Sequence, residues 1–407
     1  MRIAVDLTPV LPNGANGGAK IVAFQLVKHL AELAPHYQFL LLGTTQNIAE
    51  LEQLKAPNIQ IMNTTGQTTP QKRNLLKRIL NKLLPVQITL RLNYSLKKIK
   101  QWMKRKPKNK LADLLFCPFT GVNFKERGTP VITIVHDLQF KTYPYFFSIE
   151  DRFERRKNFE DTYQSSDKII CVSDYVNHTV ILHSGLKPNL VKTIHTRLAH
   201  RLPDIDPTLA NDLLKRLKLS NEGYLLFPAN FWVHKNHQML LTAFSIYRQK
   251  YQGHLKLVCT GADNPHKTFL LATVKKMGLA DVISMPGFLT DQEFAALLKH
   301  CKAVIFPSLY EGFGMPVLEA MAAGKPVLCS NVTSLPEVAC NAALLFDPRK
   351  PDEIADAIHR IETENDLVKK LIERGKERIA TFGTEKDMAN DYLAEINHVL
   401  NEKRTSA

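Results

Sequence analysis

The segment 311–324 holds the residues best suited to chemistry. Its two carboxylates, Glu311 and Glu319, lie eight positions apart around a glycine-rich turn. Gly312 and Gly314 carry no Cβ, so the backbone of the turn can approach a ligand closely. A carboxylate can accept hydrogen bonds from a pair of sugar hydroxyls. The spacing therefore predicts two polyol contacts around one turn.

A helix is predicted to start directly after this turn. Pro316 suits the first helical position, and Gly324 suits the residue just past the helix end. Free backbone N–H groups and the positive end of the helix dipole would then meet at one point, which is a site for a phosphate or diphosphate. One diphosphate flanked by two polyols describes a nucleotide sugar.

Two segments in the first half of the chain end in residues that suit a cleft. Gly17 and Gly18 precede a helix expected from about residue 19, where their backbone can approach a phosphate; an ordinary flexible turn is the alternative. This segment is not G-x-G-x-x-G, so the dinucleotide fingerprint is absent. His136 ends a buried strand, where a neutral histidine either makes one hydrogen bond at a cleft or serves only the structure.

Lys235 and Phe288 are the candidates in the second half. Lys235 follows a strand and precedes a helix, whose dipole disfavours a cation there. We therefore interpret it as a residue that neutralises charge on a departing diphosphate. Phe288 either packs on a nucleobase or staples its own helix. Asp204-Ile-Asp206 has the letters of a metal-binding motif, but it follows no apolar strand and receives no metal role.

These candidates follow short apolar runs that alternate with helical patterns, which is typical of a parallel α/β architecture. The predicted strands are 3–7, 38–42, 58–62, 114–117, 131–135, 168–172, 224–228, 255–259, 282–285, 303–306, 327–329 and 343–346. Ligands bind beyond the carboxyl ends of such strands. We expect two Rossmann-like domains that face each other across a cleft, with a linker within 187–222.

Size and composition agree with this expectation. A chain of 407 residues exceeds the size of most single cores, and its hydrophobic fraction of 44% is that of a globular protein. The six cysteines form no C-x-x-C pair, so we interpret them as buried and reduced, in a cytosolic protein. A charge near the N-terminus argues against a secretory signal, and no run of about 18 apolar residues predicts a membrane span.

The formal charge of +15 is concentrated in one segment. Between Gln71 and Lys110 there are 14 Lys and Arg residues and no Asp or Glu, which leaves 40 basic against 39 acidic residues elsewhere. Apolar residues recur there at helical spacing, a pattern typical of binding to an anionic membrane surface. A helical insertion packed on its own domain is the alternative. Few aromatic residues interleave with the charges, so nucleic acid is not expected as a partner.

The motifs together resemble those of a known family. Segment 311–319 matches the E-x7-E signature of the retaining GT-B glycosyltransferases (glycosyltransferase group 1, family 4). The likeness continues forward through Pro336-Glu337-Val338 and backward through His234-Lys235-Asn236 and His136-Asp137-Leu138. It covers nearly the whole chain apart from residues 63–110 and the linker.

The resemblance implies a GT-B fold. Residues 1–200, with a basic insertion at about 67–110, would form an N-terminal acceptor domain, and residues 210–383 would bind the nucleotide sugar. A terminal helix, 384–407, would cross back to the first domain. By position, His136, Lys235 and Glu311 would be catalytic. The implied donor-binding residues are Gly17, Gly18, Asn230, Phe288, Phe313, Gly314, Met315 and Glu319.

The chain departs from the family at one position. An arginine usually precedes the lysine by about five residues and pairs with the diphosphate. Here Asn230 is the candidate neutral substitute.

The expected reaction is transfer of a sugar, with retention, from a nucleotide diphosphate sugar to a glycan or lipid-linked acceptor in cell-surface polysaccharide, lipopolysaccharide or glycolipid synthesis. No cofactor or metal is expected. We expect a cytoplasmic protein that can lie peripherally on the inner face of the membrane. The alternatives are a degenerate, non-enzymatic glycosyltransferase that binds nucleic acid or anionic surfaces, and a nucleotide-sugar epimerase.

Overall fold

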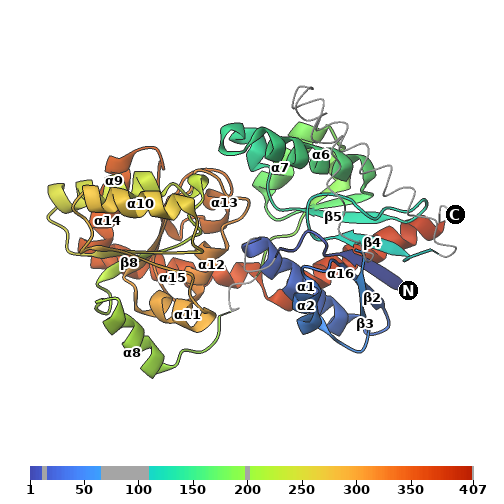
Figure 1. Cartoon of the computed structure of the whole chain (residues 1–407), viewed down its shortest axis with the longest axis horizontal. Coiled ribbons are helices and arrows are strands. Elements are labelled where there is room, and N and C mark those ends of the chain that lie inside the picture. The colour runs from blue at the N-terminus through green and yellow to red at the C-terminus, as the bar shows by residue number, and fades with distance from the viewer. Residues whose placement is uncertain (12–15, 66–109, 198–201, 406–407) are drawn as a thin grey trace, which may run out of the picture.

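The computed structural model describes residues 1–11, 16–65, 110–197 and 202–405, and it consists of two parallel sheets with helices on their faces (Figure 1). The first sheet has the strand order β3-β2-β1-β4-β5-β6-β7, and the second has the order β10-β9-β8-β11-β12-β13. We call residues 1–197 the first half and residues 202–384 the second half. The predicted membrane-binding segment 71–110 lies outside the described residues, except for Lys110.

All the predicted strands are present, and five have the predicted bounds. The first sheet consists of β1 (Arg2–Asp6), β2 (Gln38–Gly43), β3 (Ile59–Asn63), β4 (Leu114–Cys117), β5 (Val131–Val135), β6 (Lys168–Cys171) and β7 (Val191–Thr193). The second consists of β8 (Tyr224–Pro228), β9 (Lys256–Thr260), β10 (Ile283–Gly287), β11 (Ala303–Phe306), β12 (Val327–Ser330) and β13 (Ala343–Phe346). Strands such as β4, β5 and β11 are buried along their whole length, because helices cover both faces of a parallel sheet.

The helices of the first half are α1 (Gly18–Leu33), α2 (Ile48–Leu51), α5 (Gln139–Thr142), α6 (Ile149–Ser165) and α7 (Asp174–Ser184), with short 3₁₀ turns η1 (Glu52–Leu54), η2 (Pro144–Phe146) and η3 (Pro188–Leu190). Those that follow are α8 (Pro207–Arg216), η4 (Val233–Lys235), α9 (His237–Lys250), α10 (Pro265–Lys276), α11 (Asp291–His300), α12 (Met315–Ala322), α13 (Leu335–Ala339), α14 (Pro351–Thr363), α15 (Asn365–Phe382) and α16 (Glu385–Thr405). Thr290 caps α11 in a capping box with Glu293.

The predicted linker, 187–222, contains structure that the sequence analysis missed. Its strand β7 pairs with β6 at the edge of the first sheet. Its helix α8 packs on α11, where Arg216 Nη2 lies 2.8 Å from Glu293 Oε1. Asp206, from the motif that resembled a metal site, is the N-cap of α8 and accepts a hydrogen bond from the backbone N–H of Thr208 at 2.8 Å.

The terminal helix α16 crosses from the second half to the first and packs on α1, as the family resemblance implied (Figure 1). Tyr37 Oη donates to Asn397 Oδ1 at 2.6 Å, and Arg197 Nη2 pairs with Asp391 Oδ2 at 2.6 Å. Tyr392 is 1% exposed and packs edge-on against Phe116. The helix therefore completes the core of the first half.

Two further expectations can be compared with the structure. Five cysteines are buried and reduced as predicted, but Cys340 is exposed, because it ends the short surface helix α13. Among the helices described, none is both long enough and apolar enough to cross a bilayer.

Candidate active site

The turn Glu311–Gly314 follows β11 and is held from behind by the loop after β12. Thr333 Oγ1 accepts a hydrogen bond from the backbone N–H of Glu311 at 3.1 Å. The hydroxyl of Ser334 donates toward the carbonyl oxygens of Glu311, at 3.0 Å, and of Phe313, at 3.1 Å. The second half therefore fixes the shape of this turn by its own contacts.

Helix α12 starts at this turn, as predicted. Its N-cap is Gly314, whose φ of 100° favours glycine, and Pro316 lies in its first turn. Gly324, with a φ of 68°, follows the helix end. The first turn of α12 holds no acidic residue and its cap makes no side-chain hydrogen bond, so backbone donors are available to an anion.

Helix α1 of the first half starts next to α12. Its N-cap, Gly17, has a φ of 54°, and within the described residues no side chain caps the helix. A Cβ on Gly18 would lie 3.3 Å from the Sδ of Met315, the first residue of α12. Two helix N-termini thus lie close together across the halves, which concentrates positive potential suited to a diphosphate.

Lys235 and Glu311, both predicted catalytic, are in direct contact. Lys235 Nζ lies 2.6 Å from Glu311 Oε1, and their side chains are 16% and 11% exposed. The next residue, Asn236, anchors η4 by donating to the carbonyl oxygens of Pro307, at 3.0 Å, and Pro348, at 2.8 Å. A lysine held this firmly beside the turn is suited to neutralise an anion there, and its role at a leaving diphosphate stays a prediction.

His136 lies at the carboxyl end of β5 and faces the same turn through its backbone. Its Nε2 lies 2.8 Å from the carbonyl oxygen of Pro118. A carbonyl oxygen only accepts, so Nε2 carries the hydrogen and Nδ1 keeps a lone pair. Burial lowers the pKa of His136, although the bond to Pro118 and the charge of Asp137 oppose this, and the ring is neutral at pH 7. A Cβ on Gly312 would overlap the His136 carbonyl oxygen.

Glu319 and Phe313 are both buried. Glu319 lies in the second turn of α12 and is 3% exposed, and its contact with donor hydroxyls stays a prediction. Phe313 is 6% exposed, and its ring packs against His195 and Phe382. Its side chain therefore serves packing, which leaves only its backbone for a donor.

Asn230 is hydrogen-bonded to another loop, and Phe288 is exposed. Asn230 Oδ1 accepts a hydrogen bond from the backbone N–H of Ala262 at 2.8 Å, which ties the loop after β8 to the loop after β9. Phe288 follows β10 and is 73% exposed, so it does not staple α11. Its ring is free to stack on a planar ligand, and this role stays a prediction.

Three residues at the site were not predicted from the sequence: Ser173, Tyr310 and Glu337. Ser173 Oγ donates to the carbonyl oxygen of Gly312 at 2.6 Å, and Tyr310 Oη accepts from the backbone N–H of Leu138 at 3.3 Å. Glu337 binds the start of α7. Ser173 had one available signal, since it follows β6 at the same sheet edge as His136.

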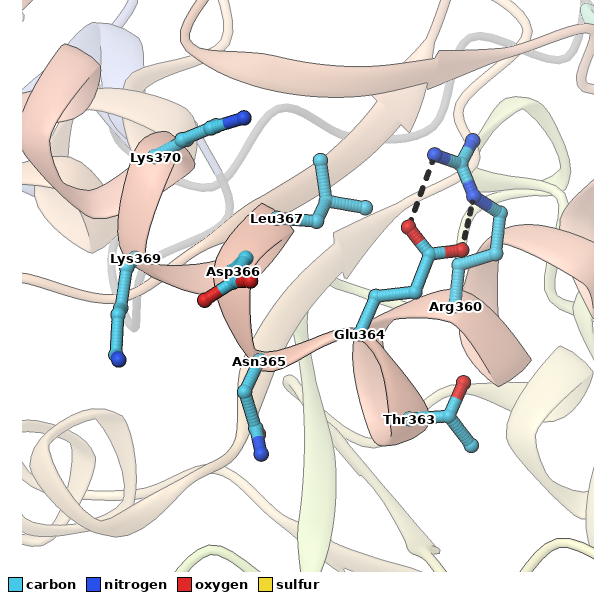
Figure 2. Close-up of a pocket in the computed structure, with 8 residues that line it drawn as sticks. All are labelled: Arg360, Thr363, Glu364, Asn365, Asp366, Leu367, Lys369 and Lys370. Carbon is cyan, nitrogen blue, oxygen red and sulfur yellow. Dashed lines mark hydrogen bonds and ion pairs between the residues drawn. The ribbon is translucent and has the colours of Figure 1, made fainter.

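A surface depression lies elsewhere in the second half, at the junction of α14 and α15 (Figure 2). There Arg360 and Glu364 form a two-point ion pair, with Nε–Oε1 at 2.9 Å and Nη2–Oε2 at 3.3 Å. None of the predicted site residues lines it.

Comparisons with known proteins bear on the family of the chain. Residues 212–378 match the family model of the glycosyl transferases group 1. O-antigen chain mannosyltransferase B of Escherichia coli is 28% identical over 239 residues, which cover 58% of this chain and 63% of that protein. O-antigen chain mannosyltransferase RfbU of Salmonella typhimurium is 30% identical over 180 residues, which cover 44% of this chain and 49% of that protein.

Solved structures show the same fold. The structure of Anabaena Alr3699/HepE in complex with UDP and glucose has a TM-score of 0.69 at 16% identity, over 98% of this chain and 99% of that one. WaaG, a glycosyltransferase involved in lipopolysaccharide biosynthesis, has a TM-score of 0.65 at 14% identity, over 95% and 98% of the two chains.

The chain spans less than two thirds of the length of the first curated relatives, 63% of mannosyltransferase B and 28% of the serotype-specific mannosyltransferase WbdA of Escherichia coli. The family model covers the part of the chain that contains Lys235, the turn Glu311–Gly314 and α12. Residues 212–378 thus carry the sequence pattern of the glycosyl transferases group 1, and the two parallel sheets with the returning terminal helix give the chain the GT-B fold.

Proposed function

We propose that this protein is a retaining glycosyltransferase that moves a sugar from a nucleotide diphosphate sugar to a hydroxyl of a glycan or lipid-linked acceptor. The mannosyltransferases of O-antigen chains among its relatives support a role in polysaccharide or lipopolysaccharide synthesis, with mannose as the first sugar to test. The complexes of Alr3699/HepE with UDP and with UDP-glucose support a nucleotide-linked donor.

The contact between Lys235 and Glu311 carries this proposal. It joins a cation and a carboxylate, at 2.6 Å, beside the helix N-termini of α1 and α12. A diphosphate at those N-termini would be neutralised by Lys235, while Glu311 remains an acceptor for sugar hydroxyls. Without a donor, the two side chains neutralise each other, which allows both to remain largely buried.

In the proposed reaction, the bond between the sugar C1 and the diphosphate oxygen breaks, and a bond from C1 to the acceptor oxygen forms on the same face. The transition state resembles an oxocarbenium ion, so negative charge develops on the leaving diphosphate. Lys235 and the N–H groups of the two helices stabilise that charge. The diphosphate takes the acceptor proton, and neutral His136 contacts the transferring sugar. The proposal assigns leaving-group stabilisation to these groups and not to a metal ion.

Transfer assays with GDP-mannose and UDP-glucose test the function. We expect Lys235→Ala and Glu319→Ala to lower kcat/KM by roughly 100-fold or more, because each removes a contact with the donor. Lys350→Ala is the matched control, since Lys350 also pairs with a glutamate, Glu353 at 2.7 Å, but at an exposed position. Circular dichroism checks that each variant is folded.

The products separate the alternatives. A new glycosidic bond supports the proposal, whereas a free epimer of the nucleotide sugar would indicate an epimerase, and no turnover with any donor would indicate a non-enzymatic protein. Wild-type rates in folded Lys235→Ala would overturn the role of Lys235.

A further inference from the structure

The N-terminus of α7, in the first half, is bonded directly to the second half. Glu337 Oε1 accepts from the backbone N–H of Asp174 at 2.7 Å, and Glu337 Oε2 accepts from that of Tyr175 at 2.9 Å. Ser173, the N-cap of α7, donates its hydroxyl to the carbonyl oxygen of Gly312 at 2.6 Å. One helix start therefore contacts both α13 and the turn Glu311–Gly314.

His195 extends this contact to the place where the chain passes between the halves. Its Nε2 lies 2.7 Å from Glu337 Oε1, and its ring packs on Phe313 and on Phe382, with centroids 6.1 and 5.7 Å apart. His195 comes two residues after β7, and Phe382 ends α15 just before α16 begins. Arg378 Nη2 donates to the carbonyl oxygen of Glu337 at 2.7 Å and holds it in place.

The electrostatics favour an ionised Glu337. Burial alone would raise the pKa of Glu337, but the hydrogen bonds from His195 and from the N–H groups of Asp174 and Tyr175 outweigh it and lower that pKa. The carboxylate also lies at the positive end of the α7 dipole. Glu337 thus acts as a charged cap, supplied by one half to a helix of the other.

Asp174, His195 and Glu337 also form a group of potential metal ligands, with atoms within 4.8 Å of one another. Both carboxylate oxygens of Glu337 already accept backbone hydrogen bonds, so a cation there would displace backbone donors. The contacts are therefore better explained as a join between the halves.

The chain passes between the halves twice, once after His195 and once after Phe382. The rings of both residues pack on Phe313, which belongs to the turn. When two bodies rotate about a hinge, the atoms nearest the hinge move least. The turn also packs on His136, since a Cβ on Gly312 would overlap the His136 carbonyl oxygen. The α7 contact, made by Ser173, His195 and Glu337, therefore lies where it can keep the turn aligned with His136.

We propose that Ser173, His195 and Glu337 are positioning residues for glycosyl transfer: they hold the turn Glu311–Gly314 against the first half, so that the donor sugar lies in one geometry between Glu311 and His136. The proposal rests on the proposed function and adds residues that act through the turn rather than on the donor.

Paired substitutions test this role. Ser173→Ala removes both a helix cap and the bond to Gly312, whereas Ser148→Ala removes only the cap of α6, where Ser148 Oγ accepts from Asp151 N at 3.1 Å. Glu337→Gln is matched by Glu353→Gln, since Glu353 accepts from the backbone N–H of Asp347 at 3.0 Å within the second half. Ser173→Thr keeps the hydroxyl and serves as the rescue.

We expect Ser173→Ala and Glu337→Gln to lower kcat about 10-fold or more, because small misplacements of reacting groups are costly. The Kd for UDP or GDP should change less than about twofold, because the contacts to the nucleotide remain. Both controls and Ser173→Thr should keep kcat within about threefold of wild type. Equal losses in the variants and their controls, or no loss in either variant, would overturn the proposal.

Hydrogen exchange gives a readout that does not depend on turnover. In Glu337→Gln the amides of Asp174 and Tyr175 should exchange faster, since one carboxylate oxygen is replaced by a donor. Unchanged exchange would overturn the α7 contact itself. If the wild-type protein transfers no sugar but these amides respond, the proposed function fails while the join between the halves stands.

Discussion

At the scale of single residues, Gly312 shows how a correct motif can have an incomplete interpretation. The sequence predicted that its missing Cβ makes room for a ligand. In the structure that room is occupied by the backbone oxygen of His136, from the other half. The glycine therefore lets the two halves meet at the turn, and the proposed donor site lies beside that contact.

Gly312→Ala should consequently separate the halves at this point. The added Cβ meets rigid backbone, whereas in Gly18→Ala it meets the flexible thioether of Met315 at 3.3 Å. We expect Gly312→Ala to lower kcat by about 10-fold or more and Gly18→Ala to have a smaller effect. Steady-state kinetics beside isothermal titration with UDP or GDP measures both. A Gly312→Ala enzyme with wild-type kcat would show that this contact is dispensable.

At the scale of elements, the long apolar strands could be predicted, whereas the short edge strand β7 and helix α8 could not. Strands such as β5 and β11 are continuous apolar runs because both faces are covered. The three-residue strand β7 lies at the sheet edge, is partly exposed and contains Lys192, so it leaves no such run. Helix α8 was missed because half of its ten residues are polar and it begins with a proline, Pro207.

Some residues of the candidate site could likewise be predicted from the sequence, and others could not. Local sequence was enough to predict Lys235, the turn and the glycines at the two helix starts, because each lies where a strand or loop meets a helix. The partners Ser173 and Gly312 are 139 positions apart, and Asp174 and Glu337 are 163 apart. A single sequence carries no signal for such pairs, since they exist only after both sheets have folded and docked.

Helix α9 supports a prediction about acid stability. His237 starts this helix, is 2% exposed and packs between Phe227 and Phe231. Burial, with the charges of His266 and Lys235, lowers the pKa of His237 from 6.5 to about 3. The unfolded chain therefore binds this proton first, so the free energy of unfolding falls as the pH drops below 6.5.

Between pH 7.5 and 5.5 this single group should cost about 1.4 kcal/mol of stability. His237→Phe keeps a ring between Phe227 and Phe231 but cannot titrate, so its stability should fall by that much less over the same range. Urea unfolding at both pH values measures the difference. Parallel pH dependences for the wild type and the variant would contradict the neutral, buried state of His237.

At the scale of the whole molecule, the charge and the site lie in different parts of the chain. Outside residues 71–110 the chain carries 40 basic and 39 acidic residues, so nearly all of its net positive charge comes from that one segment. The segment is inserted between β3 and β4 of the first half, which the family resemblance makes the acceptor domain. We propose that it brings the site to an anionic membrane that holds a lipid-linked acceptor.

Co-sedimentation with liposomes tests this placement. The protein should pellet with vesicles that contain phosphatidylglycerol, less so in high salt, and not with pure phosphatidylcholine. Replacing Lys97, Lys98, Lys100 and Lys104 by glutamine should weaken the binding without changing the affinity for UDP or GDP. Equal binding to both kinds of vesicle, or none, would count against the membrane role.

The configuration of the new glycosidic bond tests the central claim most directly. The claim is that Lys235 and the two helix starts stabilise the departing diphosphate and Glu311 holds the sugar, while the acceptor attacks on the same face of the sugar. NMR of the product formed from an α-linked donor, GDP-mannose or UDP-glucose, should show an α-glycoside, and the Lys235→Ala variant should form little of it. A β-glycoside from the wild-type protein would contradict the account.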